Sequence, residues 1–199
     1  VNNDATRVEV NTISAEMAKV RDYVPDYAVM AHRGSTFWAP EETESAWRWA
    51  REMGADYLES DLQCTKDGVI LANHDDNLKR TTNIENVYSE LVPATRKAFY
   101  MRHGMSEEEA EKLVAADKAS FRPYYAMSYM YEELLALDAG SWFNETSIEQ
   151  ARKSFAEKHQ YVSALEDQIR YAEGKMLKRG SDGERIYTVT GTWDPDKPR

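Results

Sequence analysis

The chain has 199 residues, which is long enough for one well-packed core. Its 35 acidic and 25 basic residues give a net charge of -10, and no dense stripe of Lys and Arg interrupts this background, so nucleic-acid binding is not expected. No apolar run approaches the roughly 18 residues that cross a bilayer, so stable membrane insertion is not expected either. Cys64 is alone in the sequence, which excludes an internal disulfide.

Residues 1–26 are predicted to form an N-terminal arm with scattered apolar positions, closed by Pro25. The chain begins with Val1 and continues with a polar segment. This start is compatible with a removed signal peptide as well as with a trimmed chain. A periplasmic or secreted location is slightly favoured over a cytoplasmic one.

Three short apolar runs follow, and each ends in polar residues. Residues 28–31 precede His32-Arg33-Gly34, residues 57–58 precede Glu59-Ser60-Asp61, and residues 69–72 precede Asn73-His74-Asp75. Such continuous apolar runs are typical of strands that are buried on both faces of a parallel sheet. In folds built from such strands the chemistry lies at the carboxyl ends of the strands. We therefore predict that one cleft contains His32, Arg33, Glu59, Asp61 and His74.

Between the first two runs, residues 43–53 have the apolar spacing of a helix. Gly54 is placed to end this helix. The expected core stripe consists of Ala46, Trp49, Ala50 and Met53.

Glu59 and Asp61 share one face of the second strand, because strand side chains alternate. Two unpaired carboxylates repel each other and resist burial. Their spacing indicates a nearby cation, either a basic side chain or a hard metal ion with oxygen ligands, and the alternative is a polar strand face in water.

Residues 62–68 leave no room for a crossover helix, and Asp67-Gly68 is a turn signal. We predict that this segment returns in an extended conformation, so that the third strand runs parallel to the second. His74 then reaches the same edge as His32.

The pattern next changes to a charged helical stretch. Residues 84–127 contain a capping box from Ser106 to Glu109, followed by an expected buried stripe of Ala110, Leu113 and Val114. The segment 121–131 is rich in Tyr and Met, and is expected to pack in the core, with a substrate pocket as the alternative.

Two more helices are predicted in the last third of the chain, at 147–158 and 163–173. The second has a capping box from Ser163 to Glu166 and Gly174 as its end. A short strand is predicted at 186–190, within a turn-rich segment. The expected apolar stripe of the second helix is Leu165, Ile169 and Ala172.

Several motifs together, in this order, resemble the amino-terminal part of a glycerophosphodiester phosphodiesterase. They are His32-Arg33-Gly34, Pro40-Glu41-Glu42-Thr43, Gly54-Ala55-Asp56-Tyr57-Leu58-Glu59-Ser60-Asp61, Thr65-Lys66-Asp67-Gly68, His74-Asp75, Leu78-Lys79-Arg80-Thr81-Thr82 and Leu137-Asp138-Ala139-Gly140-Ser141-Trp142-Phe143.

This resemblance implies an α/β fold, a TIM-type (β/α)8 barrel present here only as its N-terminal portion. The chain then divides into the arm 1–26, the first barrel strands 27–83, a helical insertion 84–127 after the third strand, and further barrel elements 128–199. A closed barrel usually takes roughly 250 residues. We therefore expect the natural protein to continue beyond Arg199, with strands that supply a further metal-binding acid.

The resemblance also implies cleavage of a glycerophosphodiester substrate to an alcohol and glycerol phosphate, with a divalent cation, Ca²⁺ or Mg²⁺. By position, the general acid and base are His32 and His74, Arg33 holds the phosphate, and the metal ligands are Glu59 and Asp61. Glu41 corresponds to the acid of the family's Pro-Glu-Asn-Thr run, and Glu42 replaces its Asn. These groups suit a charged ester with a poor leaving group.

Two other functions remain open. The first is a phospholipase C-like or D-like phosphodiesterase or lyase on a related barrel, because those families share paired histidines and acids. The second is a non-catalytic protein that binds phosphodiesters. No pattern in the sequence sets the oligomeric state.

Overall fold

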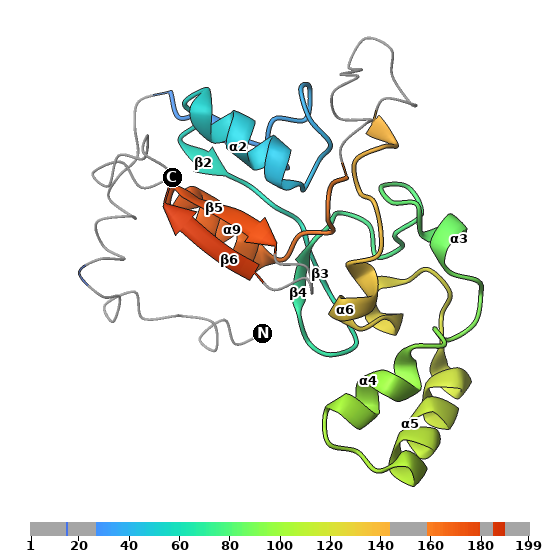
Figure 1. The fold of residues 1–199 in the computed structure, drawn as a ribbon. Helices are drawn as coiled ribbons and strands as arrows, with labels where there is room; N and C mark the ends of the chain where they lie inside the picture. Colours follow the sequence, from blue (N-terminus) through green and yellow to red (C-terminus); the bar gives the residue numbers. More distant parts are fainter. Residues whose placement is uncertain (1–14, 16–26, 144–158, 180–184, 190–199) are drawn as a thin grey trace, which may run out of the picture.

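A computed structural model describes residues 15, 27–143, 159–179 and 185–189, with side chains up to Lys175 (Figure 1). Most of the predicted N-terminal arm and the predicted helix 147–158 lie outside these residues. Among the described helices, none has the length and apolar character needed to span a bilayer.

The first described elements form the predicted strand–helix–strand unit. Strand β1 (Met30–Ala31) pairs in parallel with β2 (Tyr57–Leu58), and helix α2 (Glu44–Glu52) connects them. The Thr43 hydroxyl accepts a hydrogen bond from the amide of Ala46 at the start of α2. Gly54 follows the helix with φ +89°, a backbone conformation that glycine adopts without strain.

Residues 62–68 return without a helix, as predicted. Strand β3 (Leu62–Cys64) pairs antiparallel with β4 (Ile70–Ala72), so the chain reverses through the Thr65–Gly68 turn. The described strands pair two by two, and no described register joins β4 to β2. The parallel direction of β2 and β4 and the closure of a barrel therefore stay predictions.

The predicted core stripe of α2 is wrong at two positions. Trp49 and Met53 are 41% and 53% exposed, whereas Trp47 is fully buried together with Ala46. The buried face is rotated because Trp47 packs against Tyr171, with ring centroids 6.1 Å apart.

Tyr171 belongs to helix α9 (Leu165–Ala172), whose cap and stripe also differ from the prediction. The helix is capped by Asp167, whose carboxylate accepts a hydrogen bond from the Ala164 amide at 2.9 Å, instead of by a box from Ser163 to Glu166. Ile169 is 48% exposed. The buried residues of α9 are Asp167, Gln168 and Tyr171.

Gly174 ends α9 with φ +79°, as predicted. Strand β5 (Lys175–Arg179), which was not predicted, pairs antiparallel with β6 (Arg185–Val189) beside α9. The predicted strand 186–190 thus exists, one residue earlier.

The segment after β4 is helical, with α3 (Ile84–Val87), α4 (Arg96–Arg102), α5 (Glu107–Ser120), the 3-10 helix η3 (Ala126–Ser128) and α6 (Tyr131–Leu134). The Ser106 capping box of α5 is confirmed. Ala110 is buried, but Leu113 is 37% exposed, so the predicted stripe is wrong there. Figure 1 shows the reason, because α4 and α5 form a pair that projects from the rest and leaves much of α5 facing solvent.

The main core lies between β4, α3 and α6. The aromatic segment contributes Tyr129 and Tyr131 to this core, which supports packing as their role. The buried members of this core include Leu71, Leu78, Ile84, Ala126, Tyr129, Tyr131, Leu134 and Leu137.

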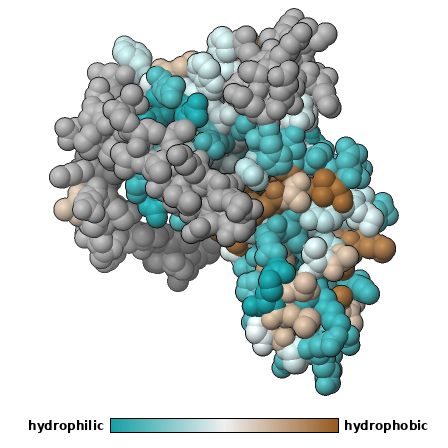
Figure 2. Space-filling model, in the orientation of Figure 1, coloured by the Kyte–Doolittle hydropathy of each residue, from teal (hydrophilic) through white to brown (hydrophobic). Residues whose placement is uncertain are grey.

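A buried charge cluster attaches the α4–α5 pair to this core. Arg96, which is fully buried, donates to Glu133 of α6 and to Asp117 of α5, with shortest distances of 2.7 Å and 2.6 Å. Lys66 of the β3–β4 turn lies 2.8 Å from Asp117. Hydrophilic side chains cover much of the projecting part on the face seen in Figure 2.

Candidate active site

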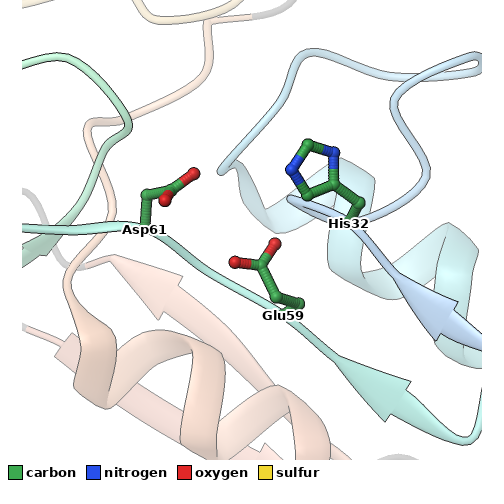
Figure 3. A group of neighbouring side chains, drawn as sticks. All are labelled: His32, Glu59 and Asp61. Atoms are coloured by element: carbon green, nitrogen blue, oxygen red, sulfur yellow. The ribbon is translucent and has the colours of Figure 1, made fainter.

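Three predicted site residues come together where β1 and β2 end. One ligand atom each from His32, Glu59 and Asp61 lies within 4.8 Å of the others, and their side chains face a common space (Figure 3). The parallel β1–β2 pairing produces this approach. The backbone pairing extends one residue beyond the end of β2, because the Glu59 amide donates to the carbonyl of Ala31, the last residue of β1, at 3.1 Å.

Arg33 lies next to this cluster. Its amide donates to a Glu59 carboxylate oxygen at 2.9 Å, with φ at +56°. Its guanidinium lies 3.0 Å from Asp61 Oδ2, through Nε, and 3.3 Å from Glu41 Oε1, through Nη1. The basic side chain that the paired acids indicated is therefore present.

The cluster also fits a divalent cation. Asp61 Oδ2 and Arg33 Nε are buried but make no hydrogen bond, so their contact is an ion pair and the carboxylate oxygen keeps unused lone pairs. Carboxylate oxygens are the donors that Ca²⁺ and Mg²⁺ prefer. The ring of His32, expected to act as an acid or base, adds a nitrogen to the set.

Sequence reasoning gave no role to Glu42, yet its side chain contacts the loop that carries Glu59 and Asp61. Its side chain accepts hydrogen bonds from the Asp61 amide at 2.8 Å and from the Ser60 hydroxyl at 2.5 Å. Burial raises the pKa of the Glu42 carboxyl to about 7, although these two hydrogen bonds lower it. The signal in the sequence was its departure from the family's Asn.

His74 is tied to the cluster through the backbone of β4. The Asn73 amide donates to the Asp61 carbonyl at 2.9 Å, which places the end of β4 beside the acidic loop. The His74 ring is 42% exposed, and its Nδ1 lies 2.5 Å from Asp75 Oδ1. The convergence of His74 with the other four residues thus has support from the backbone, and its catalytic role stays a prediction.

A cavity of about 370 Å³ opens beside His32. Residues 34–38 line one part of it, including Phe37 and Trp38, and β1 lines another. It provides space for a small molecule next to the cluster.

The comparisons with known proteins agree with these motifs. A model of the Glycerophosphoryl diester phosphodiesterase family matches residues 32–185. A glycerophosphodiester phosphodiesterase of Bacillus subtilis is 31% identical over 126 residues, which cover 63% of this chain and 30% of that protein. Another from Caldanaerobacter subterraneus is 49% identical over 64 residues, covering 32% of this chain and 26% of that protein.

Among solved structures, the chain is similar to a glycerophosphodiester phosphodiesterase from Agrobacterium tumefaciens at 27% identity and a TM-score of 0.45. That match covers 74% of this chain and 43% of the other. The chain therefore spans less than half the length of these relatives. Because the family match covers more than half of its residues, this chain belongs to the Glycerophosphoryl diester phosphodiesterase family.

Proposed function

We propose that the protein carrying this sequence is a metal-dependent phosphodiesterase that hydrolyses glycerophosphodiesters to an alcohol and glycerol phosphate. The observation that carries the proposal is the cluster of His32, Glu59 and Asp61, with Arg33 beside it, at the ends of two parallel strands. Family membership supports the substrate class. We further propose that β1, β2 and β4 belong to a TIM-type barrel.

The cluster provides the charges that a phosphodiester requires. Glu59 and Asp61 would hold the divalent cation, which supplies Lewis-acid stabilisation of the phosphate oxygens when bound. Arg33 donates N–H groups to the phosphate, and a charged fork of this kind binds phosphate oxygens strongly. Because Arg33 already contacts Asp61 and Glu41, its guanidinium is held near the place where the phosphate binds.

The two histidines divide the proton transfers. One imidazole removes a proton from the attacking hydroxyl or water as its oxygen bonds to phosphorus, and the other protonates the alcohol oxygen as its bond to phosphorus breaks. His74 suits such exchange because its Nδ1 faces Asp75, which leaves Nε2 for the substrate.

The test is release of glycerol phosphate from a panel of glycerophosphodiesters, with and without a chelator. We expect release that the chelator abolishes and that added Ca²⁺ or Mg²⁺ restores. His32→Ala and His74→Ala should each abolish release. Lys97→Ala should not, because Lys97 lies on α4 and, within the described residues, forms only two exposed ion pairs, with Glu107 and Glu111.

Two outcomes would contradict the proposal. If both histidine variants keep wild-type rates, their acid and base roles are wrong. If no glycerophosphodiester is cleaved although several bind with measurable heat, the protein is the non-catalytic binding protein that the sequence left open.

A further inference from the structure

Arg80 belongs to the motif 78–82, to which the proposed mechanism gives no role. Its guanidinium joins two segments that are far apart in the sequence. Nη2 donates to Glu41 Oε1 at 2.6 Å, in the loop after β1, and Nε donates to Asp75 Oδ2 at 2.7 Å, in the loop after β4. Nη2 also donates to Asp75 Oδ1 at 3.2 Å, so the Asp75 carboxylate is held by two N–H groups.

Each of these acids also contacts a proposed active-site group. Glu41 Oε1 lies 3.3 Å from Nη1 of Arg33, and Asp75 Oδ1 lies 2.5 Å from Nδ1 of His74. The five side chains thus form one continuous series of contacts from Arg33 to His74, three ion pairs and a final hydrogen bond between Asp75 and His74, with Arg80 at its centre.

Arg80 keeps the Asp75 carboxylate ionised, and this sets the hydrogen bond that His74 makes. Hydrogen bonds from Arg80 hold the pKa of Asp75 down to about 2, against a smaller effect of burial that raises it. Asp75 is therefore ionised at neutral pH and accepts the hydrogen bond from His74 Nδ1. A carboxylate in this position selects the imidazole tautomer that carries its proton on Nδ1 and leaves Nε2 free.

We infer that Arg80 is a positioning residue, which fixes the tautomer and orientation of the His74 ring through Asp75 and restrains Arg33 through Glu41. The catalytic consequence of this positioning rests on the proposed function. The arrangement of the His74 ring does not depend on the proposed function.

An alternative is an ordinary surface ion pair, because the Arg80 side chain is 43% exposed. Such pairs contribute little to stability. A purely structural Arg80 would change the melting temperature or nothing, and would leave the His74 tautomer as it is. The test must therefore measure the ring itself.

The experiment compares Arg80→Ala, Arg80→Lys and Asp75→Asn in the protein carrying this sequence. Lys79→Ala is the matched control, because Lys79 is the neighbouring cation of the same motif and pairs with exposed Glu85. Ring ¹⁵N NMR reports which nitrogen of His74 carries the proton, and loss of its signals in His74→Asn assigns them. Rates of glycerol phosphate release give kcat and KM.

We expect wild-type His74 to carry its proton on Nδ1, and Arg80→Ala and Asp75→Asn to give a mixture of tautomers. In Arg80→Ala, kcat should fall about 10- to 100-fold, the usual cost of losing a group that orients another. Arg80→Lys keeps the charge but not the fork, so part of kcat should return. Lys79→Ala should match the wild type in both measurements.

The outcomes separate the inference from the proposed function. If the His74 tautomer and kcat are both unchanged in the two Arg80 variants, the inference is overturned. The same holds if only the melting temperature falls. If the wild type cleaves no glycerophosphodiester but the His74 tautomer still depends on Arg80, the proposed function fails and the positioning of the ring stands.

Discussion

The buried guanidinium of Arg96 gives the most informative test of how the α4–α5 pair is held. Arg96 is 0% exposed and donates to Glu133, Asp117 and the Ser128 carbonyl. In Arg96→Met the side chain keeps much of its volume but loses every one of these hydrogen bonds. Buried Glu133 then loses the cation that pairs with it, and buried Asp117 loses one of its two cationic partners among the described residues, Arg96 and Lys66.

Removing one member of a buried ion pair typically costs 3–5 kcal/mol. The lower end applies here, because Asp117 keeps Lys66 at 2.8 Å and the Tyr100 hydroxyl at 2.8 Å, and Glu133 keeps the Met130 amide at 2.9 Å. We expect Arg96→Met to lower the free energy of unfolding by about 3 kcal/mol. For a chain of this size that corresponds to about 6–12 °C in melting temperature.

The assay is urea and thermal unfolding, followed both by far-UV circular dichroism and by tryptophan fluorescence. Residues 84–127 contain no Trp, so a loss of helix that precedes the fluorescence change would locate the damage in α4 and α5. Lys97→Ala is the matched control, because the neighbouring cation forms only exposed ion pairs and should change little.

At acidic pH the free energies of unfolding of the wild type and of Arg96→Met should lie closer together. Burial by itself raises the pKa of Asp117, but hydrogen bonds from Lys66 and Arg96 outweigh it, and the pKa lies below its ordinary value of 3.8. This stabilisation is present above pH 3.8 and is lost as the pH falls below it. A variant as stable as the wild type at pH 7 would refute the reasoning.

Four further outcomes are expected. Gly34→Ala should lower the free energy of unfolding by about 2–5 kcal/mol, because φ is +88° and a Cβ would lie 2.7 Å from the Ala46 Cβ. Gly68→Ala should lower it by only about 1–2 kcal/mol, because φ is +84° but the space around the residue is open. Arg33→Ala should lower kcat/KM about 100-fold or more while circular dichroism stays unchanged, and an unaltered kcat/KM would exclude phosphate binding by this residue. Glu59→Gln should weaken Ca²⁺ binding more than about tenfold in calorimetry, and equal affinity would remove Glu59 from the ligand set. A carboxyl NMR titration of the wild type should give Asp75 a midpoint near pH 2, and the midpoint in Arg80→Ala should be higher. Equal midpoints in the two proteins would show that Arg80 does not hold this carboxylate.

Most local features were predicted from the sequence, because they depend on neighbouring residues, and the exception is the cap of α9, which lies one residue later than predicted. Ser106 caps α5 through Glu109, Gly54 and Gly174 follow helices with positive φ, and the turn at Thr65–Gly68 reverses the chain. Each of these signals acts within a few residues, so no knowledge of the tertiary structure was needed.

The buried helix faces were harder to predict, because they depend on distant partners. Trp47 and Tyr171 pack against each other across 124 positions of sequence, and neither belonged to a predicted stripe. Gln168 is buried although polar, because its Nε2 donates to the Leu58 carbonyl at 3.3 Å. A hydrophobic pattern cannot anticipate a polar residue whose partner is a strand backbone.

The site shows the same division. The paired acids Glu59 and Asp61 and the adjacent Arg33 were found from their spacing at strand ends, and these residues lie together. The contacts of Glu42 and Arg80 beside the site were missed, because their partners Ser60 and Glu41 lie 18 and 39 positions away in the sequence.

The attachment of the α4–α5 pair has a consequence for protein engineering. Lys66 and Glu133 face this pair from outside it, and each forms an ion pair with a residue of α4 or α5. A deletion that removed only the two helices would therefore leave Lys66 and Glu133 without these ion-pair partners at the new surface. A shortened variant, or a chimaera that exchanges these helices for another unit, requires compensating substitutions at Lys66 and Glu133, or an incoming unit that supplies the charges of Asp117 and Arg96.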